Sequence, residues 1–203
     1  MPQPSIARIE RGTVLPRTAT LIALLAATGY RLTVEPIGPT VDREAIQRRL
    51  AMAVPQRTRQ AMPATGSASP VRALRGLRRF GVPFVVIGEL AEIAHGSPTK
   101  INRVVFEVCH ASTDVATKRL GQALDDLGPQ ADTLRPVTET DAGDDYDVLV
   151  RNAVGMHLDP GILVRVASVD DLIRARRARR TPTDDEAAAV LVAIEDVRAG
   201  REN

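Results

Sequence analysis

Aromatic side chains are scarce in this chain of 203 residues, which has three Phe, two Tyr and no Trp. Surfaces that bind single-stranded nucleic acid stack successive bases on aromatic rings, so we expect any bound nucleic acid to be duplex. Long apolar runs are missing too: none reaches the 18 residues of a membrane span, and the start of the chain has no apolar stretch typical of a signal peptide. We therefore expect a cytoplasmic protein.

Cysteine occurs once, at Cys109, so an internal disulfide is excluded. It stands in an apolar, strand-like run, which favours an unreactive thiol in the core. The neighbouring His110 does not complete a metal site with it. We expect no metal to be bound by this pair.

Charge is unevenly distributed along the chain, although the net charge is only +2. Residues 1–80 contain 13 Arg and 4 acidic residues, whereas residues 81–203 contain 14 Lys and Arg and 21 acidic residues. A basic first part beside an acidic second part predicts a nucleic-acid contact on the N-terminal part only.

Periodicity and composition predict an α+β protein in two parts. The first part, residues 1–61, is predicted to contain a short helix over 2–10, a helix over 18–29, a strand over 30–36 and a helix over about 42–52. The stretch "MPATGSASP" at 62–70 lacks periodicity and is predicted to be the domain linker.

The second part, residues 71–203, is predicted to be a mixed sheet with helices packed on it. Its expected helices cover 71–80, 89–95, 112–127, 169–179 and 184–198. Its expected strands cover 83–87, 103–109 and about 163–166, and the stretch up to about 145 has no clear pattern. Ser168 and Asp171 are spaced to cap the helix that starts at Val169.

The segment "PSIARIERG" with the following "TLIALLAATG" has the pattern of two successive helices. Ile6 and Ile9 can turn inward at helical spacing, while Gln3, Ser5 and Arg8 project from the opposite side. Gln can pair with adenine and Arg with guanine, and Ser can contact phosphate or a base. Such a helix suits the major groove of DNA, although the same residues could be an ordinary solvated helix face.

Residues 2–35 closely resemble the recognition helix and the following helix of the lambda-repressor-like (XRE) helix-turn-helix family. The resemblance implies that Gln3, Ser5 and Arg8 contact bases and that Arg11 and Arg17 contact phosphates. In that motif a preceding helix packs on the reader helix and crosses the DNA backbone. This sequence begins within the motif, so two alternatives are open: the true start lies upstream of Met1, or the module is a remnant that binds DNA weakly or not at all. In either case we expect these 203 residues to bind duplex DNA more weakly than a chain extended upstream.

The stretch "GVPFVVIGELAEIAHGSP" at 81–98 has the pattern of a strand, a glycine turn and a helix with a His-Gly-Ser-Pro stop. Together with "VRVASVDDLIRARRARRTPTDDEAAAVLVAI", it resembles the minimal nucleotidyltransferase fold of toxin–antitoxin and abortive-infection proteins, over residues 74–128 and 145–198. That chemistry needs a glycine-rich turn for phosphates, two acids at i and i+2 for Mg²⁺, and usually a third acid.

This sequence departs from the family at the positions that carry chemistry. Gly88 keeps the turn, but Glu89 opposes a triphosphate there. The two expected aspartates are replaced by Arg103 and Val105, which leaves Glu107 as a lone carboxylate. Arg176 stands where the family often has a phosphate-facing Lys, and we interpret it as a surface arginine. The predicted degenerate nucleotide pocket comprises Gly88, Glu89, Ser97, Arg103, Val105, Glu107 and Arg176.

The third family acid has no clear counterpart, because "TETDAGDDYD" at 138–147 has acids but no strand pattern. We interpret Asp141, Asp144, Asp145 and Asp147 as members of a solvated loop rather than as metal ligands.

Three hypotheses remain open at this point. The first is a DNA-binding transcriptional regulator, antitoxin-like, with a catalytically degenerate nucleotidyltransferase-like domain. That domain would serve for homodimerisation or for binding a cognate protein partner, with no membrane contact, catalytic residue, metal or cofactor. The second is a Mg²⁺-dependent nucleotidyltransferase acting on RNA or protein through Glu107 and an acid from 141–147. The third is a decayed gene product without function.

Overall fold

The structure is a computed structural model that describes residues 18–30, 41–62, 70–100 and 105–201. The chain divides into two compact units, Met1–Gly38 and Pro39–Asn203. Among the described helices, none combines the length and the apolar character that a membrane span requires.

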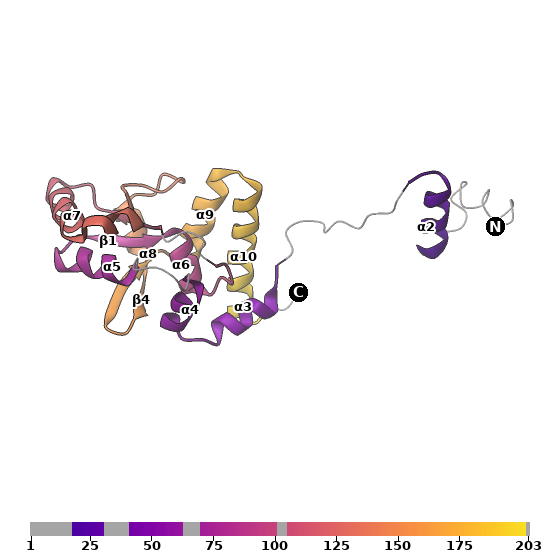
Figure 1. Ribbon diagram of the computed structural model, residues 1–203, viewed down its shortest axis with the longest axis horizontal. Helices are drawn as coiled ribbons and strands as arrows, with labels where there is room; N and C mark the ends of the chain where they lie inside the picture. Colours follow the sequence, from indigo (N-terminus) through magenta and orange to yellow (C-terminus); the bar gives the residue numbers. More distant parts are fainter. Residues whose placement is uncertain (1–17, 31–40, 63–69, 101–104, 202–203) are drawn as a thin grey trace. The chain divides into compact units, whose positions relative to one another are not determined.

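The described part of the first unit contains helix α2 (Thr18–Ala27) (Figure 1). The prediction that this helix stops at Gly29 is confirmed. Gly29 has a φ of +81°, a left-handed conformation that glycine adopts without strain, and the Tyr30 N–H donates to the Leu25 carbonyl over 2.8 Å. The predicted helix over 2–10 lies outside the described residues, as does the predicted strand beyond Tyr30.

The second unit is built around a mixed sheet of five strands in the order β3-β2-β1-β5-β4, so the expected α+β class is confirmed. β1 is antiparallel to β2 and parallel to β5, β2 is parallel to β3, and β4 is antiparallel to β5. All four residues of the central strand β1 are buried. The strands are β1 (Phe84–Ile87), β2 (Phe106–His110), β3 (Leu134–Val137), β4 (Val154–Asp159) and β5 (Ile162–Val166).

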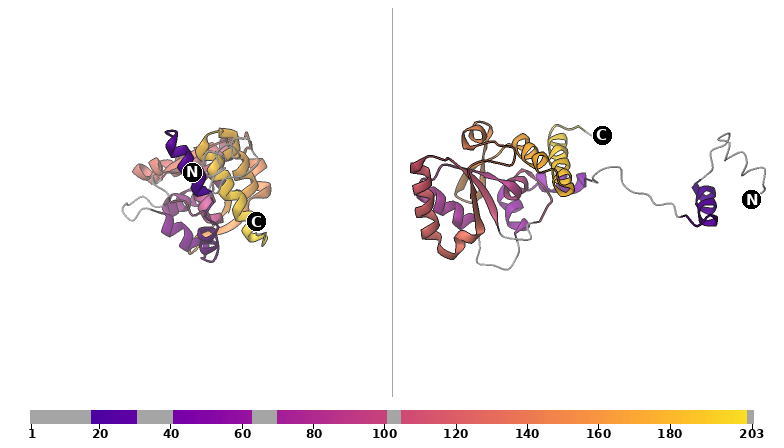
Figure 2. Two further views of the ribbon diagram at one scale, coloured as in Figure 1. Left: turned by 90° about the vertical axis from the view of Figure 1, so that its right-hand side faces the viewer. Right: turned by 90° about the horizontal axis from the view of Figure 1, so that it is seen from above.

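Helices of the second unit gather at opposite ends of this sheet (Figure 1, Figure 2). α5 packs with α7 at one end, whereas α9 packs with α10 at the other. The helices are α3 (Arg43–Leu50), α4 (Val54–Ala61), α5 (Pro70–Arg79), α6 (Gly88–His95), α7 (Asp114–Leu127), the short 3-10 helix η1 (Gly128–Thr133), α8 (Tyr146–Asn152), α9 (Val169–Arg179) and α10 (Pro182–Arg198).

Side-chain caps begin several of these helices, as the sequence predicts for one of them. The Asp171 N–H donates to Ser168 Oγ over 3.2 Å at the start of α9, so the predicted cap is confirmed. Thr181 Oγ1 caps α10 in the same way, accepting from the Asp184 N–H. The capped residues Asp171 and Asp184 also accept hydrogen bonds from Arg174 and Arg176.

Helices α3 and α4 belong to the unit that contains the sheet, not to the N-terminal module in which the sequence placed them. The Arg57 guanidinium of α4 donates to the carbonyl oxygens of Leu50, Met52 and Ala94 at 2.8–2.9 Å. Ile46 of α3 is completely buried in the core of this unit. The division of the chain therefore falls between Gly38 and Pro39, whereas the sequence predicts the linker at 62–70.

This division also changes where the positive charge lies. Of the 13 arginines in residues 1–80, nine follow Gly38 and so belong to the second unit. The expectation that a nucleic-acid contact is restricted to the N-terminal module therefore loses its basis in charge, because most of the basic excess is carried by α3, α4 and α5.

Several elements differ from the sequence prediction. β3, α8 and β4 occupy stretches for which the sequence predicts no element, and α4 is likewise unpredicted. The described part of β2 begins at Phe106, so Val105 precedes the strand instead of lying within it. Cys109 is fully buried on β2, as predicted, and burial raises the pKa of its thiol to about 12, helped by nearby carboxylates such as Asp145. It is therefore an unreactive core thiol.

Candidate functional site: a cavity beside the glycine turn

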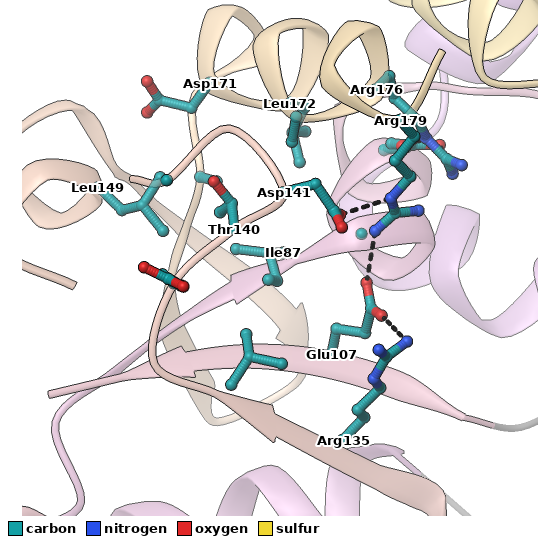
Figure 3. Close-up of a pocket in the computed structure, with 17 residues that line it drawn as sticks. Ile87, Glu107, Arg135, Thr140, Asp141, Leu149, Asp171, Leu172, Arg176 and Arg179 are labelled. Carbon is teal, nitrogen blue, oxygen red and sulfur yellow. Dashed lines mark hydrogen bonds and ion pairs between the residues drawn. The ribbon is translucent and has the colours of Figure 1, made fainter. Parts of the chain in front are cut away.

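A cavity of about 370 Å³ opens where β1 leads into α6, and α9 and the loop after β3 complete its walls (Figure 3). Such a volume is at the lower end of the range for small-molecule sites. Its apolar lining comes from Ile87, Val137, Leu149, Ala167, Leu172 and Ala175. Its charged lining comes from Glu92, Glu107, Arg135, Glu139, Asp141, Asp171, Arg176 and Arg179. The charged side chains decide what chemistry the cavity permits.

Glu107 lies against the glycine turn in which a phosphate was expected. Glu107 on β2 is paired with Ile87 on β1, directly before Gly88. Gly88 has a φ of +64°, and a Cβ built on it would lie 2.5 Å from Glu107 Oε2. The turn therefore needs glycine for both its conformation and its closeness to this carboxylate. The space at the start of α6 holds an anionic side chain of the protein itself.

Arg179 lies between the two carboxylates that the transferase hypothesis requires. Its Nε donates to Asp141 Oδ2 over 2.5 Å, and its Nη2 lies 3.7 Å from Glu107 Oε2 (Figure 3). Arg135 holds the other oxygen of Glu107 at 3.0 Å. The structure thus brings together Glu107 and Asp141 of the 141–147 loop. The guanidinium of Arg179, however, lies between them, where a shared metal ion would have to bind.

Arg176 is largely buried, so its interpretation as a surface arginine is wrong. Its side chain is 13% exposed and pairs with Glu92 through Nε and Nη2, at 2.7 and 3.1 Å. Its Nη1 donates to Asp184 over 2.7 Å. The sequence could not show that α6 and α10 each supply a buried carboxylate at this point.

The protonation of this cluster follows from burial and pairing. Burial raises the pKa of Glu92 above its ordinary value, although the hydrogen bonds from Arg176 oppose this. Burial alone would raise the pKa of Asp184, but Thr181 and Arg176 outweigh it and lower the pKa. Burial also acts to lower the pKa of Arg176, but its two carboxylate partners raise it overall. Arg176 is therefore a permanent cation that favours the ionised form of both partners, and only at Asp184 does this pairing outweigh burial.

The acidic loop after β3 is fastened to α9 instead of being free in solvent. Arg174 Nη2 donates to Asp144 over 2.9 Å, and Arg179 holds Asp141, which is 47% exposed at its side chain. The Asp144 side chain is only 17% exposed, so its prediction as a solvated acid is wrong. Asp145 caps α8 by accepting from the Val148 N–H. Asp141, Asp144 and Asp145 thus have structural partners that the sequence pattern did not reveal, whereas Asp147 is exposed in the first turn of α8.

The structure brings most of the predicted pocket residues together. Gly88, Glu107 and Arg176 line the main cavity, and Glu89 and Val105 join Glu107 and Arg176 at a smaller pocket of about 180 Å³. Ser97 does not join them: it is buried, and its Oγ lies 2.9 Å from Thr99 Oγ1. Arg103 lies outside the described residues, as do the DNA-contact candidates Gln3, Ser5, Arg8, Arg11 and Arg17.

Arg135 and Arg179 are the important cavity residues that the sequence analysis missed. Arg179 stands three residues after Arg176 on α9, a spacing that places two side chains on the same helix face. This spacing was a sequence signal by which Arg179 could have been identified. Arg135 lies on the unpredicted strand β3, so no pattern in the sequence connected it with Glu107.

The carboxylates of the cavity do not fit a Mg²⁺ ion. Mg²⁺ demands several oxygen ligands in near-octahedral geometry, whereas Glu107 and Asp141 share the guanidinium of Arg179. Within the ranges that the structure describes, no group of three or more His, Cys, Asp or Glu side chains could hold a metal ion.

The His-Gly-Ser-Pro stop of α6 has a structural role. Nε2 of His95 donates to the Ala167 carbonyl over 2.8 Å, and Arg198 donates to the His95 carbonyl over the same distance. Gly96 ends the helix with a φ of +119°. The stop therefore joins α6 to the segment after β5 and to α10, and does not line the cavity.

Comparisons of the chain with models of protein families, with curated proteins and with solved structures found no match.

Proposed function

We propose that the protein is a DNA-binding transcriptional regulator, antitoxin-like, whose second unit is a nucleotidyltransferase-like domain without catalytic activity. In this proposal the first unit contacts the bases of duplex DNA through Gln3, Ser5 and Arg8, which the sequence predicts to share one helix over 2–10. The second unit serves for homodimerisation or for binding a cognate protein partner.

The observation that carries the proposal is the position of Arg179 between Glu107 and Asp141. A transferase that used these carboxylates would need their oxygens for Mg²⁺, which neutralises the phosphate oxygens during transfer. Here the same oxygens are neutralised by an arginine of the protein. This favours a binding role over catalysis for the cavity.

Two further features support the reading of the domain as degenerate. The glycine turn is occupied by the Glu107 carboxylate, which opposes a phosphate at the same place. Arg176, at the position of a phosphate-facing lysine in the family, is committed to Glu92 and Asp184. A nucleotide would have to break these buried pairs before it could use the guanidinium.

The DNA-binding part of the proposal is supported by the pattern of residues 2–35 and by α2, which is followed by the predicted glycine stop at Gly29. In a helix-turn-helix protein the reader helix supplies base contacts, and neighbouring basic residues fix it on the phosphates.

One experiment tests whether catalysis is absent. The melting temperature of the full chain is measured during a titration with Mg²⁺-ATP, because only a ligand that binds the folded state raises it. We expect no shift and no transfer of label from radioactive nucleoside triphosphates to RNA or protein. A saturable rise in melting temperature together with Mg²⁺-dependent labelling would establish the transferase instead.

A second experiment tests DNA reading. The full chain is used to select duplexes from a random library at fixed low salt, and the enriched sequence is then tested by gel shift. We expect Gln3→Ala and Arg8→Ala to weaken binding to that sequence and to relax its base preference, each by about 1–3 kcal/mol. Arg177→Ala, which removes an exposed arginine from the second unit, is the control. Absence of enrichment, or equal effects of all three substitutions, would overturn the assignment.

A further inference from the structure

Helix α5 carries an unusual excess of positive charge for a helix of the second unit. It has four arginines and no acidic residue, the largest basic excess among the described helices. By contrast, α9 combines its arginines with Asp170 and Asp171, and α10 is acidic overall. Helix α5 therefore contributes more to the basic excess of residues 1–80 than any other described helix. The arginines are Arg72, Arg75, Arg78 and Arg79.

All four arginines lie on the exposed side of α5. At 100° per residue they fall within an arc of roughly 120°, and Arg72 to Arg79 span about 10 Å along the axis. The opposite side is buried and includes Leu74 and Leu77, which fix the rotation of the helix against the core. The arginines therefore form one continuous surface, which we call the α5 arginine face.

The guanidinium groups of this face remain available to a partner. Within the described part of the chain, Arg72 and Arg78 have no ion pair or side-chain hydrogen bond. Arg75 and Arg79 have one acid each, Asp159 and Asp126, at 3.5 and 3.4 Å, and their side chains are 60% and 72% exposed. Such exposed pairs contribute little stability and leave further N–H groups free.

We infer that the α5 arginine face binds the phosphate backbone of duplex DNA, as a second contact besides the one proposed for the first unit. This inference rests on the proposed DNA-binding function. Guanidinium groups match phosphate oxygens in a bidentate geometry. Duplex DNA carries one charge per about 3.4 Å of axis on each strand, so a face about 10 Å long spans several phosphates.

The chemistry of the face favours nucleic acid over an acidic protein. Protein interfaces have an apolar core within a polar rim, but none of the exposed large hydrophobic side chains of the described residues lies on α5. A face of arginines without an apolar centre is suited to a polyanion. It carries no base-reading pattern, so it contributes affinity that is independent of sequence.

The test compares two double variants of the full chain. Arg72→Ala with Arg78→Ala removes the two arginines of the face that have no ion pair with any described residue. Arg151→Ala with Arg177→Ala removes two exposed arginines of α8 and α9 that likewise have no partner among the described residues. Both variants lose the same charge, so a difference between them reports the position of the arginines and not the net charge.

The measurement is the affinity for duplex DNA at several salt concentrations. Each lost phosphate contact lowers the slope of log K against log salt by about 1. We expect the slope of the α5 variant to fall by about 2 on every duplex sequence, and that of the control variant to stay close to the wild type. Equal slopes in the two variants would overturn the inference.

The same experiment separates this inference from the proposed function. If Arg8→Ala changes base preference while the α5 variant behaves like its control, the proposed function stands and the α5 contact is refuted. If the α5 variant alone changes the salt dependence, the α5 contact stands and DNA reading by the first unit is refuted. If the wild type binds no duplex at 50 mM salt but binds poly-glutamate through α5, both are refuted in favour of an acidic protein partner.

Discussion

Arg176 is a largely buried cation that pairs with two buried carboxylates of the second unit. It neutralises two carboxylates, Glu92 and Asp184, whose side chains are 4% and 8% exposed. Removing one partner of a buried ion pair leaves an uncompensated charge, which is more costly than the pair is stabilising. A residue that the sequence analysis interpreted as a surface arginine therefore has a strong structural reason to be present.

We predict that Arg176→Ala lowers the free energy of unfolding by about 3–5 kcal/mol. The neighbouring exposed Arg177 is the matched control, because Arg177→Ala should change stability by less than about 0.5 kcal/mol. Urea denaturation of both variants at pH 7 measures the difference. If the two variants are equally stable, the Arg176 cluster contributes little to the folded state.

His95 gives the stability a predictable dependence on pH. Burial lowers the pKa of His95 to about 4, and the neighbouring charges of Arg198 and Arg57 act in the same direction against the hydrogen bond to Ala167. Because the pKa is lower in the folded state, the unfolded chain binds the additional proton first as the pH falls. Stability is therefore complete above the unfolded pKa of about 6.5 and declines towards pH 4.

We predict that titration of His95 lowers the free energy of unfolding by at most about 3 kcal/mol between pH 7 and pH 4, at about 1.4 kcal/mol per pKa unit. Urea denaturation at pH 7, 6, 5 and 4 measures it. His95→Gln keeps a donor for the Ala167 carbonyl, but the glutamine side chain does not titrate, so the stability of this variant should decline less over this pH range. Parallel curves for wild type and variant would show that other groups cause the decline.

At the scale of elements, the sequence predicted those with strong local signals. The apolar run of β1, the glycine turn, α6, α7 and the capped helix α9 follow from periodicity and caps. β3 is four residues long and contains Pro136, and β4 contains Gly155 and His157, so neither has a clear alternation. These strands are formed by pairing with β2 and β5, which a local pattern cannot reveal.

The same limit applies to the candidate site, of which the sequence predicted only the part that local patterns reveal. It identified Gly88 and Arg176 from the family pattern, and Glu107 as the lone carboxylate near the two substituted aspartates. All three line the cavity. It did not identify the ion pairs of Arg179 and Arg135, because these depend on where α9 and β3 pack relative to β2. Contacts between distant segments decide the charge of the cavity, and no local pattern determines them.

The cap of α9 offers a test at this scale. We predict that Ser168→Ala lowers the free energy of unfolding by about 1 kcal/mol, because the Asp171 N–H loses its side-chain acceptor. Ser168→Asp keeps an acceptor and should restore most of that stability. Thermal or urea denaturation compares the three proteins. An unchanged stability in Ser168→Ala would mean that water replaces the hydroxyl without cost.

At the scale of the whole molecule, the composition of residues 62–70 predicts one domain boundary, whereas the contacts of the structure place the boundary between Gly38 and Pro39. The second assigns α3 and α4 to the folding unit of the sheet. Three observations support that assignment. Ile46 is completely buried, Arg57 bonds to the Ala94 carbonyl of α6, and Thr58 Oγ1 donates to the Leu158 carbonyl of β4 over 2.9 Å.

We therefore predict that a chain of residues 39–203 unfolds cooperatively with nearly the stability of the second unit in the full chain, whereas residues 71–203 do not. The shorter chain exposes the surface that Ile46, Leu50 and Ala61 cover, and the completely buried Ile46 alone contributes about 1.5–3 kcal/mol. That loss is large against the 5–15 kcal/mol by which domains are usually stable. Urea denaturation followed by circular dichroism compares the two chains, with the full chain as control. Equal midpoints for both truncated chains would restore the boundary at 62–70, because α3 and α4 would then add nothing to the stability of the sheet.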